Sequence, residues 1–329
     1  MIFINDLTTE ILNVCITYWY VAIAIYLLRV VSSSFNSFTS YGKLDSNRLN
    51  NSNNNQPQQQ QNINNRSILS ALYLDYQLFE TKYGWFLFYL TAFSSAMSLL
   101  GIVYLLDLYN NINYHNVIFL IIFYCMIMFQ SIRRMYETIE IQVHSFSMMN
   151  VLLFVSGISY YIMATVSPLA EFIARLEFKY IEPQLDYDNQ EYDDNEINNM
   201  YKLIIVVFLV ASLLQQRIHK QLAAIRKSST TSTNNSNNTI NDNSKPYYEI
   251  PKGGLFNLVS CPHFLMEIII YFCFVALSNF KSKTLCLNLI HRALESHNWY
   301  KKTFKSTYPS NRKAIIPFLF LNKDKDVCT

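Results

Sequence analysis

The sequence predicts an all-α membrane protein, a bundle of six or seven transmembrane helices. Only 15% of its 329 residues are charged, whereas an ordinary soluble domain has about 25%, and 51% are hydrophobic. The hydrophobic residues gather in runs of about 20, long enough for a helix to cross a ~30 Å hydrocarbon core. The mean hydropathy of +0.11 is low because polar tracts separate these runs. A net charge of +3 is too small to indicate nucleic-acid binding.

Six runs have the length and composition of membrane spans. A seventh, 283–300, is weaker because Lys283, Arg292 and Glu295 would have to be shielded within the bundle or line a wet cavity. A cleaved signal peptide is the alternative interpretation of the first run. The run lacks a basic N-terminal region and a small-residue cleavage site, so we expect it to remain in the protein. The strong runs are 11–31, 84–106, 115–132, 145–168, 203–216 and 262–280.

Two polar tracts, 46–65 and 228–244, are rich in Asn and have almost no apolar side chains to bury. Folding cannot offset the entropy of ordering them, so we expect both to be disordered insertions without chemistry. They divide the chain into a first span with the start of a loop (1–45), a transmembrane bundle (66–227) and a C-terminal domain (245–329).

The six cysteines are scattered singly and form no C-x-x-C pair. This spacing indicates neither a metal site nor a disulfide framework, because both need cysteines brought together in sets. We interpret them as packing residues. They are Cys15, Cys125, Cys261, Cys273, Cys286 and Cys328.

The placement of Lys and Arg predicts the orientation of the helices. If residues 32–83 are cytoplasmic, the same side holds most of the 26 basic residues, as the positive-inside rule requires. The loop 169–202 is acidic and would be lumenal or external. The C-terminus is therefore expected to be cytoplasmic.

This orientation gives a prediction about glycosylation. The sequons at Asn50, Asn65, Asn234 and Asn237 all fall on the cytoplasmic side, so none should carry a glycan. Treatment with an endoglycosidase should leave the electrophoretic mobility of the protein unchanged. A mobility shift would overturn the orientation.

The third run ends in FQSIRRMYETIEIQVH (129–144), which places Arg133 and Arg134 side by side. Arginines at the cytoplasmic end of a span are most simply topology anchors. The alternative is that they and Tyr136 grip a phosphate-bearing ligand at the membrane face, since guanidinium groups bind phosphate through two parallel hydrogen bonds.

Gln215, His219 and Arg226 recur at i, i+4 and i+11 on the helix that continues the fifth span. This spacing places them on one face of the helix. Such a row is usually a solvated face, and it would bind a ligand only if it lay beside a pocket.

Residues 250–271 (IPKGGLFNLVSCPHFLMEIIIY) combine a turn, an interfacial segment and the start of a span. The PKGG motif predicts the turn, and Pro262 is placed to begin the helix. Glu267 lies one turn inside that helix and needs a partner or a proton there. The Gly pair is too short for a dinucleotide-binding fingerprint, because no strand precedes it.

Residues 291–318 (HRALESHNWYKKTFKSTYPSNRKAIIPF) place Arg292, His297 and Tyr300 on adjacent helical turns, followed by Arg312. A histidine can donate hydrogen bonds or transfer a proton near neutral pH. The spacing alone leaves open whether this segment is a site or a polar helix face.

Together these segments resemble the steroid 5α-reductase family. The resemblance covers nearly all of the chain outside the two Asn-rich tracts and the acidic loop, and the last two motifs are the most specific. It implies a multi-span bundle of the endoplasmic reticulum that binds NADPH from the cytosol, with 245–329 as the reductase domain. The matching segments are YGK (41–43), WFLFY (85–89), QSIRRMYE (130–137), the Gln215–His219–Arg226 row, IPKGGLFNLVSCPHFLMEIIIY and the HNWY…YPSNRKAIIPFLF ending.

The resemblance also implies roles for individual residues. His297 occupies the His position of the polyprenol-reducing branch, and His297, Tyr300 or Tyr136 would polarise the substrate carbonyl or return a proton. Tyr300 would also help to hold the dinucleotide. The other implied cofactor-binding residues are Arg133, Arg134, Gln215, His219, Arg226, Arg292 and Arg312.

Two features favour the polyprenol-reducing branch. The stretch between Tyr41 and Trp85 has no Gln-Glu pair before Leu-Pro, which steroid-reducing members carry, and the Q-x3-H row suits the polyprenol branch. Hydride is a nucleophile, and an α,β-unsaturated aldehyde accepts the resulting charge on oxygen whereas an allylic alcohol cannot. The expected reaction is therefore polyprenal to dolichal, within the conversion of polyprenol to dolichol, the sugar carrier for N-glycosylation.

Alternative functions belong to two classes. The first is a related enzyme that reduces a 3-oxo-Δ4 steroid or, less favourably, an enoyl thioester. The second is a non-catalytic multi-span protein, such as a transporter or scaffold, although the sequence has no internal repeat typical of transporters. The expected partners are the polyprenol or polyprenal substrate and membrane lipid, with no nucleic acid and no obligate protein partner.

Overall fold

The computed structural model describes residues 2–31, 77–110, 114–143, 148–181, 194–234, 249–277, 287–309 and 311–315. The chain forms two compact units that divide inside helix α8. The first is Met1–Ile205 with Leu277–Phe280, and the second is Val206–Ala276 with Lys281–Thr329. The tract 46–65, most of the tract 228–244 and the middle of the acidic loop lie outside the described residues.

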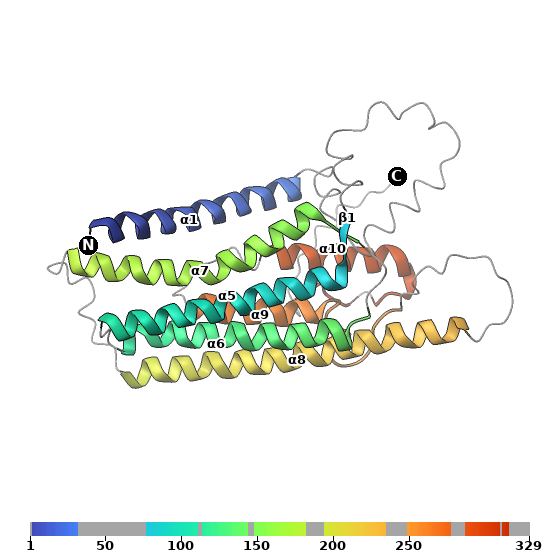
Figure 1. Cartoon of the computed structure of the whole chain (residues 1–329). Coiled ribbons are helices and arrows are strands. Elements are labelled where there is room, and N and C mark those ends of the chain that lie inside the picture. Colours follow the sequence, from blue (N-terminus) through green and yellow to red (C-terminus); the bar gives the residue numbers. More distant parts are fainter. Residues whose placement is uncertain are drawn as a thin grey trace, which may run out of the picture. The chain divides into compact units, whose positions relative to one another are not determined.

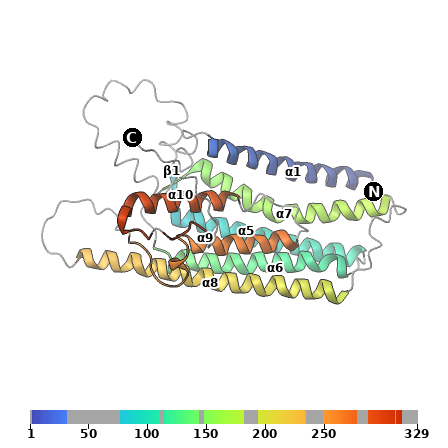
Figure 2. The same cartoon turned by 180° about the vertical axis from the view of Figure 1, so that it is seen from behind.

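The first unit is a bundle of helices packed side by side (Figures 1 and 2). Helix α1 lies against α7, α7 against α5, and α5 against α6. The prediction of an all-α membrane bundle is confirmed. The bounds are α1 Ile2–Val31, α5 Thr81–Asn110, α6 Tyr114–Tyr136, its π-helical continuation η3 Glu137–Ile141, α7 Val151–Ile181, and α8 Asp194–Asn234, whose first residues belong to this unit.

A short antiparallel sheet precedes two of these helices. Strand β1 (Gln77–Glu80) pairs with β2 (Met148–Asn150), with Gln77 opposite Asn150. The span that was predicted to begin at residue 145 therefore begins as helix α7 at Val151. The backbone of β2 bonds to a neighbouring strand instead of forming a first helical turn.

Side-chain hydrogen bonds link the helices of the first unit. Trp19 on α1 donates from Nε1 to Ser167 Oγ on α7 at 3.0 Å. The Tyr124 hydroxyl on α6 donates to the Thr165 carbonyl on α7, also at 3.0 Å, in the turn before Pro168. Hydrogen bonds between transmembrane helices contribute about 1 kcal/mol each.

Helices α5 and α7 meet through aromatic rings. Phe88 stacks on Phe154 with ring centroids 5.7 Å apart, and Tyr89 meets Tyr161 edge to face at 5.9 Å. Gly157 on α7 lies directly against this cluster, because a Cβ atom built on it would be 2.4 Å from the Phe88 ring. The missing side chain lets the two helices approach closely enough for the rings to pack.

Gly157→Ala should therefore destabilise the protein by about 1–3 kcal/mol, because the added methyl group overlaps the Phe88 ring. Gly101→Ala is the matched control, since no atom lies within 4 Å of its Cβ position. Alanine is also the better helix former there by about 1 kcal/mol. Size-exclusion chromatography of the detergent-solubilised proteins after heating should show a lower melting temperature for Gly157→Ala alone. Equal melting temperatures would contradict the close contact.

The second unit contains the C-terminal part of α8, two shorter helices and their connecting turns. Its core places Cys261 against Ala293 and Ile315, with Phe264 and Leu265 packed around them. Three segments that are distant in sequence thus meet around Cys261. The elements are the 3₁₀ turn η4 Gly254–Asn257, α9 Pro262–Leu277, α10 Leu287–Phe304 and the 3₁₀ turn η6 Lys305–Thr307.

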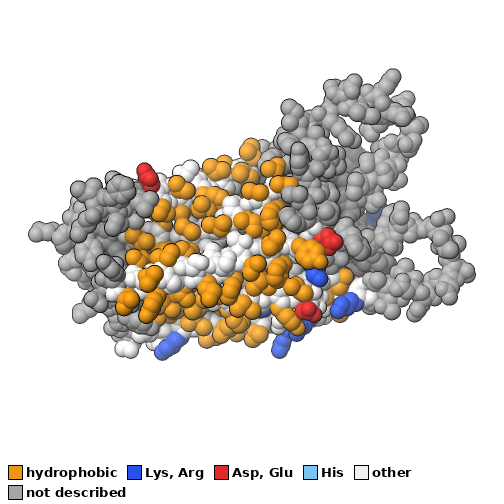
Figure 3. All heavy atoms as spheres, in the orientation of Figure 1, with side chains coloured by type: hydrophobic (Ala, Val, Ile, Leu, Met, Phe, Trp, Pro, Cys, Tyr) orange, Lys and Arg blue, Asp and Glu red, His pale blue; other side chains and the backbone are white. Residues whose placement is uncertain are grey.

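Four of the described helical stretches are long and apolar enough to cross a membrane, which makes this a multi-pass membrane protein. Many hydrophobic side chains lie on the visible face of the molecule in Figure 3. Val14, Met97 and Val155 are among the large hydrophobic side chains that are exposed. Thr9–Ile25 and Pro262–Leu277 are shorter apolar helices. The four stretches are Thr81–Leu106, Val117–Ile141, Val151–Ala174 and Asn195–Lys227.

The weak seventh run corresponds to α10 over residues 287–300, and residues 278–286 lie outside the described part. Helix α10 has 18 residues, but it is not among the apolar helices. Its ionisable side chains and its two lysines in the last turn make it too polar for an ordinary lipid-facing span.

Candidate functional site

A turn and a proline start the segment that builds the site. Gly253 and Gly254 have φ angles of 89° and 55°, in the left-handed region that glycine adopts without strain. The Gly253 N–H donates to Asn257 Oδ1 at 2.9 Å, and Pro262 is the first residue of α9. The turn and the helix start predicted from PKGG and Pro262 are both confirmed.

A backbone pairing brings the chain's last described residues beside this segment. Val259 forms a parallel β-bridge with Lys313. The Ser260 N–H donates to the Lys313 carbonyl at 2.8 Å, and the Lys313 N–H donates to the Leu258 carbonyl at 3.2 Å. The loop after α10 is therefore fixed next to Ser260.

His297 lies at the centre of the resulting cluster. Its side chain is buried on α10, and its Nδ1 lies 2.6 Å from Ser260 Oγ. The Tyr308 hydroxyl is hydrogen-bonded to the same Oγ and lies 3.5 Å from Nδ1. Ser260 Oγ also donates to the Lys313 carbonyl at 3.0 Å.

Aromatic rings and a cation complete this cluster. The Tyr300 ring stacks on Tyr308, with centroids 5.9 Å apart, and on Phe304 at 6.0 Å. The Arg312 guanidinium lies over the Tyr308 ring, 5.4 Å from its centroid, which is within the range of a cation–π contact. The structure thus brings together three sequence-predicted residues, His297, Tyr300 and Arg312.

Burial raises the pKa of Tyr308 above its ordinary value of 10, and the Ser260 hydrogen bond and the Arg312 charge oppose that rise. The net upward shift of this pKa keeps the Tyr308 hydroxyl protonated at neutral pH, because burial disfavours the phenolate. Tyr308 therefore retains a proton that it can donate within the cluster.

Arg312 is suited to an anionic ligand. Its side chain is only 4% exposed, and its Nε makes no hydrogen bond to any described residue. Within the described ranges, Arg312 forms no ion pair. A buried cation needs a compensating charge, and a phosphate group of a dinucleotide would provide one.

The row on α8 lies against the start of α9. Gln215 is fully buried and donates from Nε2 to the His263 carbonyl at 3.5 Å. The His219 ring is buried, and its centroid lies 6.0 Å from that of His263. Arg226, two turns beyond His219 and predicted to share its face, is exposed. Gln215 and His219 are thus packed in the interior of this unit, whereas Arg226 is exposed.

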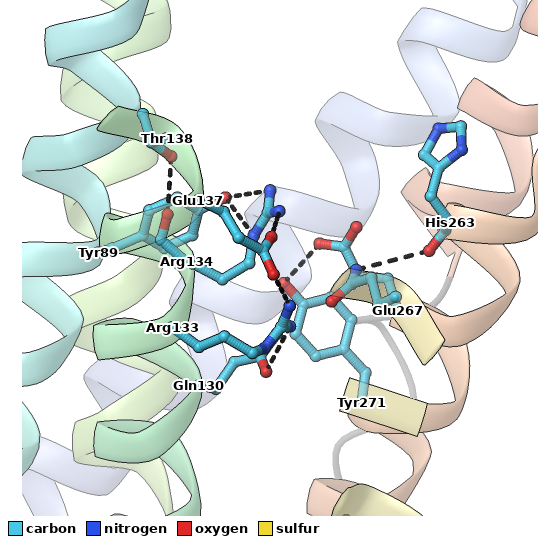
Figure 4. A network of polar contacts seen from close by, with 10 residues as sticks. Tyr89, Gln130, Arg133, Arg134, Glu137, Thr138, His263, Glu267 and Tyr271 are labelled. Atoms are coloured by element: carbon cyan, nitrogen blue, oxygen red, sulfur yellow. Dashed lines mark hydrogen bonds and ion pairs between the residues drawn. The ribbon is translucent and has the colours of Figure 1, made fainter. Parts of the chain in front are cut away.

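Arg133 and Arg134 belong to the first unit, where they share one carboxylate (Figure 4). Glu137 is completely buried and accepts from Arg133 Nη1 through one oxygen and from Arg134 Nη1 through the other, the latter at 2.7 Å. Arg134 also donates from Nη2 to the Tyr89 hydroxyl at 2.7 Å. Glu137 thus holds the two arginines together at the end of α6.

Three further predicted positions complete the comparison with the sequence. Tyr136 is 53% exposed at the end of α6. Arg292 lies on α10, but its side chain is outside the described part. Glu267 is half-buried, and Tyr271 donates to its Oε1 at 3.4 Å within α9 (Figure 4).

Sequence reasoning did not single out Ser260, Tyr308 or Glu137. Glu137 had a usable signal, since it lies three and four residues after the two arginines and such spacing favours ion pairs on a helix. Ser260 and Tyr308 had none, because their contacts span 37 and 48 residues of sequence.

Residues 165–320 match the family model described as 3-oxo-5-alpha-steroid 4-dehydrogenase. Residues 165–320 therefore form a domain similar to the steroid 5α-reductase family. This domain contains the whole cluster around His297. The resemblance read from the sequence motifs is thereby confirmed.

Several curated proteins are similar to this chain. A polyprenal reductase of Caenorhabditis elegans is 32% identical over 193 residues, which are 57% of this chain and 56% of that protein. A polyprenal reductase of Drosophila melanogaster is 45% identical over 76 residues, 21% of this chain and 23% of that protein. The steroid 5-alpha-reductase DET2 of Gossypium hirsutum is 43% identical over 79 residues, 22% of this chain and 30% of that protein. The chain spans about half the length of the relatives that it matches over the longest stretches.

Proposed function

We propose that this protein is an NADPH-dependent oxidoreductase that reduces the α-isoprene double bond of long-chain polyprenal to give dolichal. The reaction is a step in converting polyprenol to dolichol for protein N-glycosylation. The observation that carries the proposal is the buried His297–Ser260–Tyr308–Arg312 cluster inside a steroid 5α-reductase family domain. The longest similarities, to polyprenal reductases, support the choice of substrate.

Arg312 is the residue of this cluster best suited to hold a phosphate of NADPH, because it is buried and cationic. Gln215, His219, Arg226, Arg292, Arg133 and Arg134 remain proposed contributors to cofactor binding. When bound, NADPH supplies the hydride, and the protein supplies position and electrostatics.

The remaining chemistry falls to the chain's own side chains. Hydride addition to the double bond leaves negative charge on the aldehyde oxygen, and a donor at that oxygen stabilises the enolate. The α carbon then takes a proton. His297, Tyr300 and Tyr136 are the proposed groups for these two tasks. The isoprenoid tail can remain in lipid between the helices, so only the aldehyde head needs a shaped pocket.

We also propose that the protein resides in the endoplasmic reticulum membrane with its C-terminus in the cytoplasm. The distribution of Lys and Arg supports this orientation. It would place Arg312 on the side where cytosolic NADPH is available.

The substrate can be tested with membranes from cells that express the full chain. NADPH oxidation and mass-spectrometric detection of product should be followed with polyprenal, polyprenol or a 3-oxo-Δ4 steroid added separately. The proposal expects dolichal from polyprenal and no product from polyprenol unless an oxidising enzyme is present. Turnover of the steroid alone would overturn the isoprenoid assignment, and no turnover of any substrate would favour a non-catalytic membrane protein.

A further inference from the structure

The hydrogen bonds of Ser260 determine where the proton of His297 lies. Ser260 Oγ contacts the Lys313 carbonyl at 3.0 Å, His297 Nδ1 at 2.6 Å, and the Tyr308 hydroxyl. A serine hydroxyl has one proton and two lone pairs. The carbonyl can only accept, so Ser260 must donate its one proton to Lys313. The other two contacts are then hydrogen bonds only if both Tyr308 and His297 donate to Ser260.

Tyr308 fits this assignment independently. Burial raises the pKa of its hydroxyl, which therefore has a proton to donate to Ser260. The Arg312 guanidinium lies over the Tyr308 ring and, as a group that only donates, cannot take that proton. Cys261 and Tyr300 are further titratable groups that these segments bring to the cluster. Cys261 Sγ lies 3.8 Å from the Ala293 carbonyl, and the Tyr300 ring stacks on Tyr308.

We propose that Ser260 and Tyr308 are positioning residues that hold His297 in the tautomer protonated at Nδ1. Nε2 is then the nitrogen that carries the lone pair when the ring is neutral and the extra proton when the ring is charged. Assigning this arrangement to catalysis rests on the proposed function, but the tautomer itself does not.

The tautomer has a chemical consequence for the reduction. If the charged ring gives its Nε2 proton to the α carbon of the enolate, the N–H bond breaks, a C–H bond forms, and both opposite charges disappear. The ring is then neutral with its proton on Nδ1, which is the form that Ser260 already binds. The histidine therefore needs no rearrangement after the transfer. A neutral ring protonated at Nε2 would have no proton to offer Ser260.

The tautomer can be measured by NMR without any turnover. The full chain, labelled with ¹⁵N-histidine and reconstituted in lipid nanodiscs, should give ring-nitrogen shifts for a protonated Nδ1 and an unprotonated Nε2 at a pH where His297 is neutral. The spectrum of a His297→Gln variant identifies the signals by their loss. A protonated Nε2 with an unprotonated Nδ1 in the unmodified protein would overturn the proposal, whether or not the protein reduces polyprenal.

Variants of Ser260 can show whether this residue positions the His297 ring or only packs against it. Ser260→Ala should shift the His297 signals toward the other tautomer and lower kcat about tenfold, the effect of losing one hydrogen bond, with little change in KM for NADPH. Ser260→Thr keeps the hydroxyl and should restore both the signals and kcat. Ser306→Ala, an exposed serine on the turn after α10, is the control and should change neither.

Tyr308→Phe gives a second, independent measurement. It removes one donor to Ser260 but leaves the acceptor of His297, so Nδ1 should stay protonated and the pH dependence of kcat should shift. An unchanged tautomer in Ser260→Ala together with an unchanged kcat would show that Ser260 does not position the ring.

Discussion

Replacement of His297 with alanine is expected to lower NADPH-dependent turnover of polyprenal by at least about 100-fold, the usual effect of losing a general acid. His297 is buried at the centre of the cluster, and the cluster's hydrogen bonds converge on its partner Ser260. The protein should still insert into the membrane, because α10 is not one of the apolar helices that make the bundle. Turnover per mole of protein in purified membranes measures the effect.

Asn298→Ala is the matched control for this variant. Asn298 is the next residue on the same helix, but its side chain is exposed, so its loss should leave turnover unchanged. Unchanged activity in His297→Ala would remove this histidine from the site. Equal losses in both variants would instead indicate damage to α10.

Replacement of Glu137 with glutamine should have the largest effect on stability. Glu137 is completely buried, and each of its carboxylate oxygens accepts from a buried arginine. Glutamine keeps the shape but removes the negative charge that Arg133 and Arg134 both contact. Breaking a buried ion pair in this way costs about 3–5 kcal/mol. The melting temperature in detergent and the yield of folded protein should both fall.

Glu140→Gln provides the comparison, because Glu140 lies in the same π-helical turn and is exposed. An exposed carboxylate contributes about 0–1 kcal/mol, so its loss should shift the melting temperature little. Similar melting temperatures for the two variants would mean that the Glu137 ion pairs add no net stability.

The sequence predicted the existence of the helices better than the residues at which they begin and end. The apolar runs that contain Trp85 and Phe208 needed only membrane length to be recognised, and both form helices. Helix α8 was predicted to continue the fifth span as far as Arg226, but the tract from residue 228 was expected to be disordered. That expectation is wrong for its first residues, because α8 continues to Asn234. The start of α7 was missed because strand pairing by residues 148–150 leaves no mark in hydropathy.

The residues of the candidate site were also predicted only in part. His297, Tyr300 and Arg312 were predicted because their residue types and motif pointed to chemistry, and the structure gathers them in one unit. Ser260 could not be predicted, because a serine is chemically ordinary until its neighbours are known. The exposure of Arg226 also depends on three-dimensional packing. The cofactor roles of these arginines stay predictions.

The pairing of Val259 with Lys313 has a consequence for how the protein matures. The carbonyl that receives the Ser260 proton belongs to Lys313, so the surroundings of His297 can close only after that residue has left the ribosome. The membrane helices are synthesised earlier and can insert before then. A premature stop codon shortly before position 313 would therefore yield a chain that reaches the bilayer but never completes the hydrogen bonds around His297.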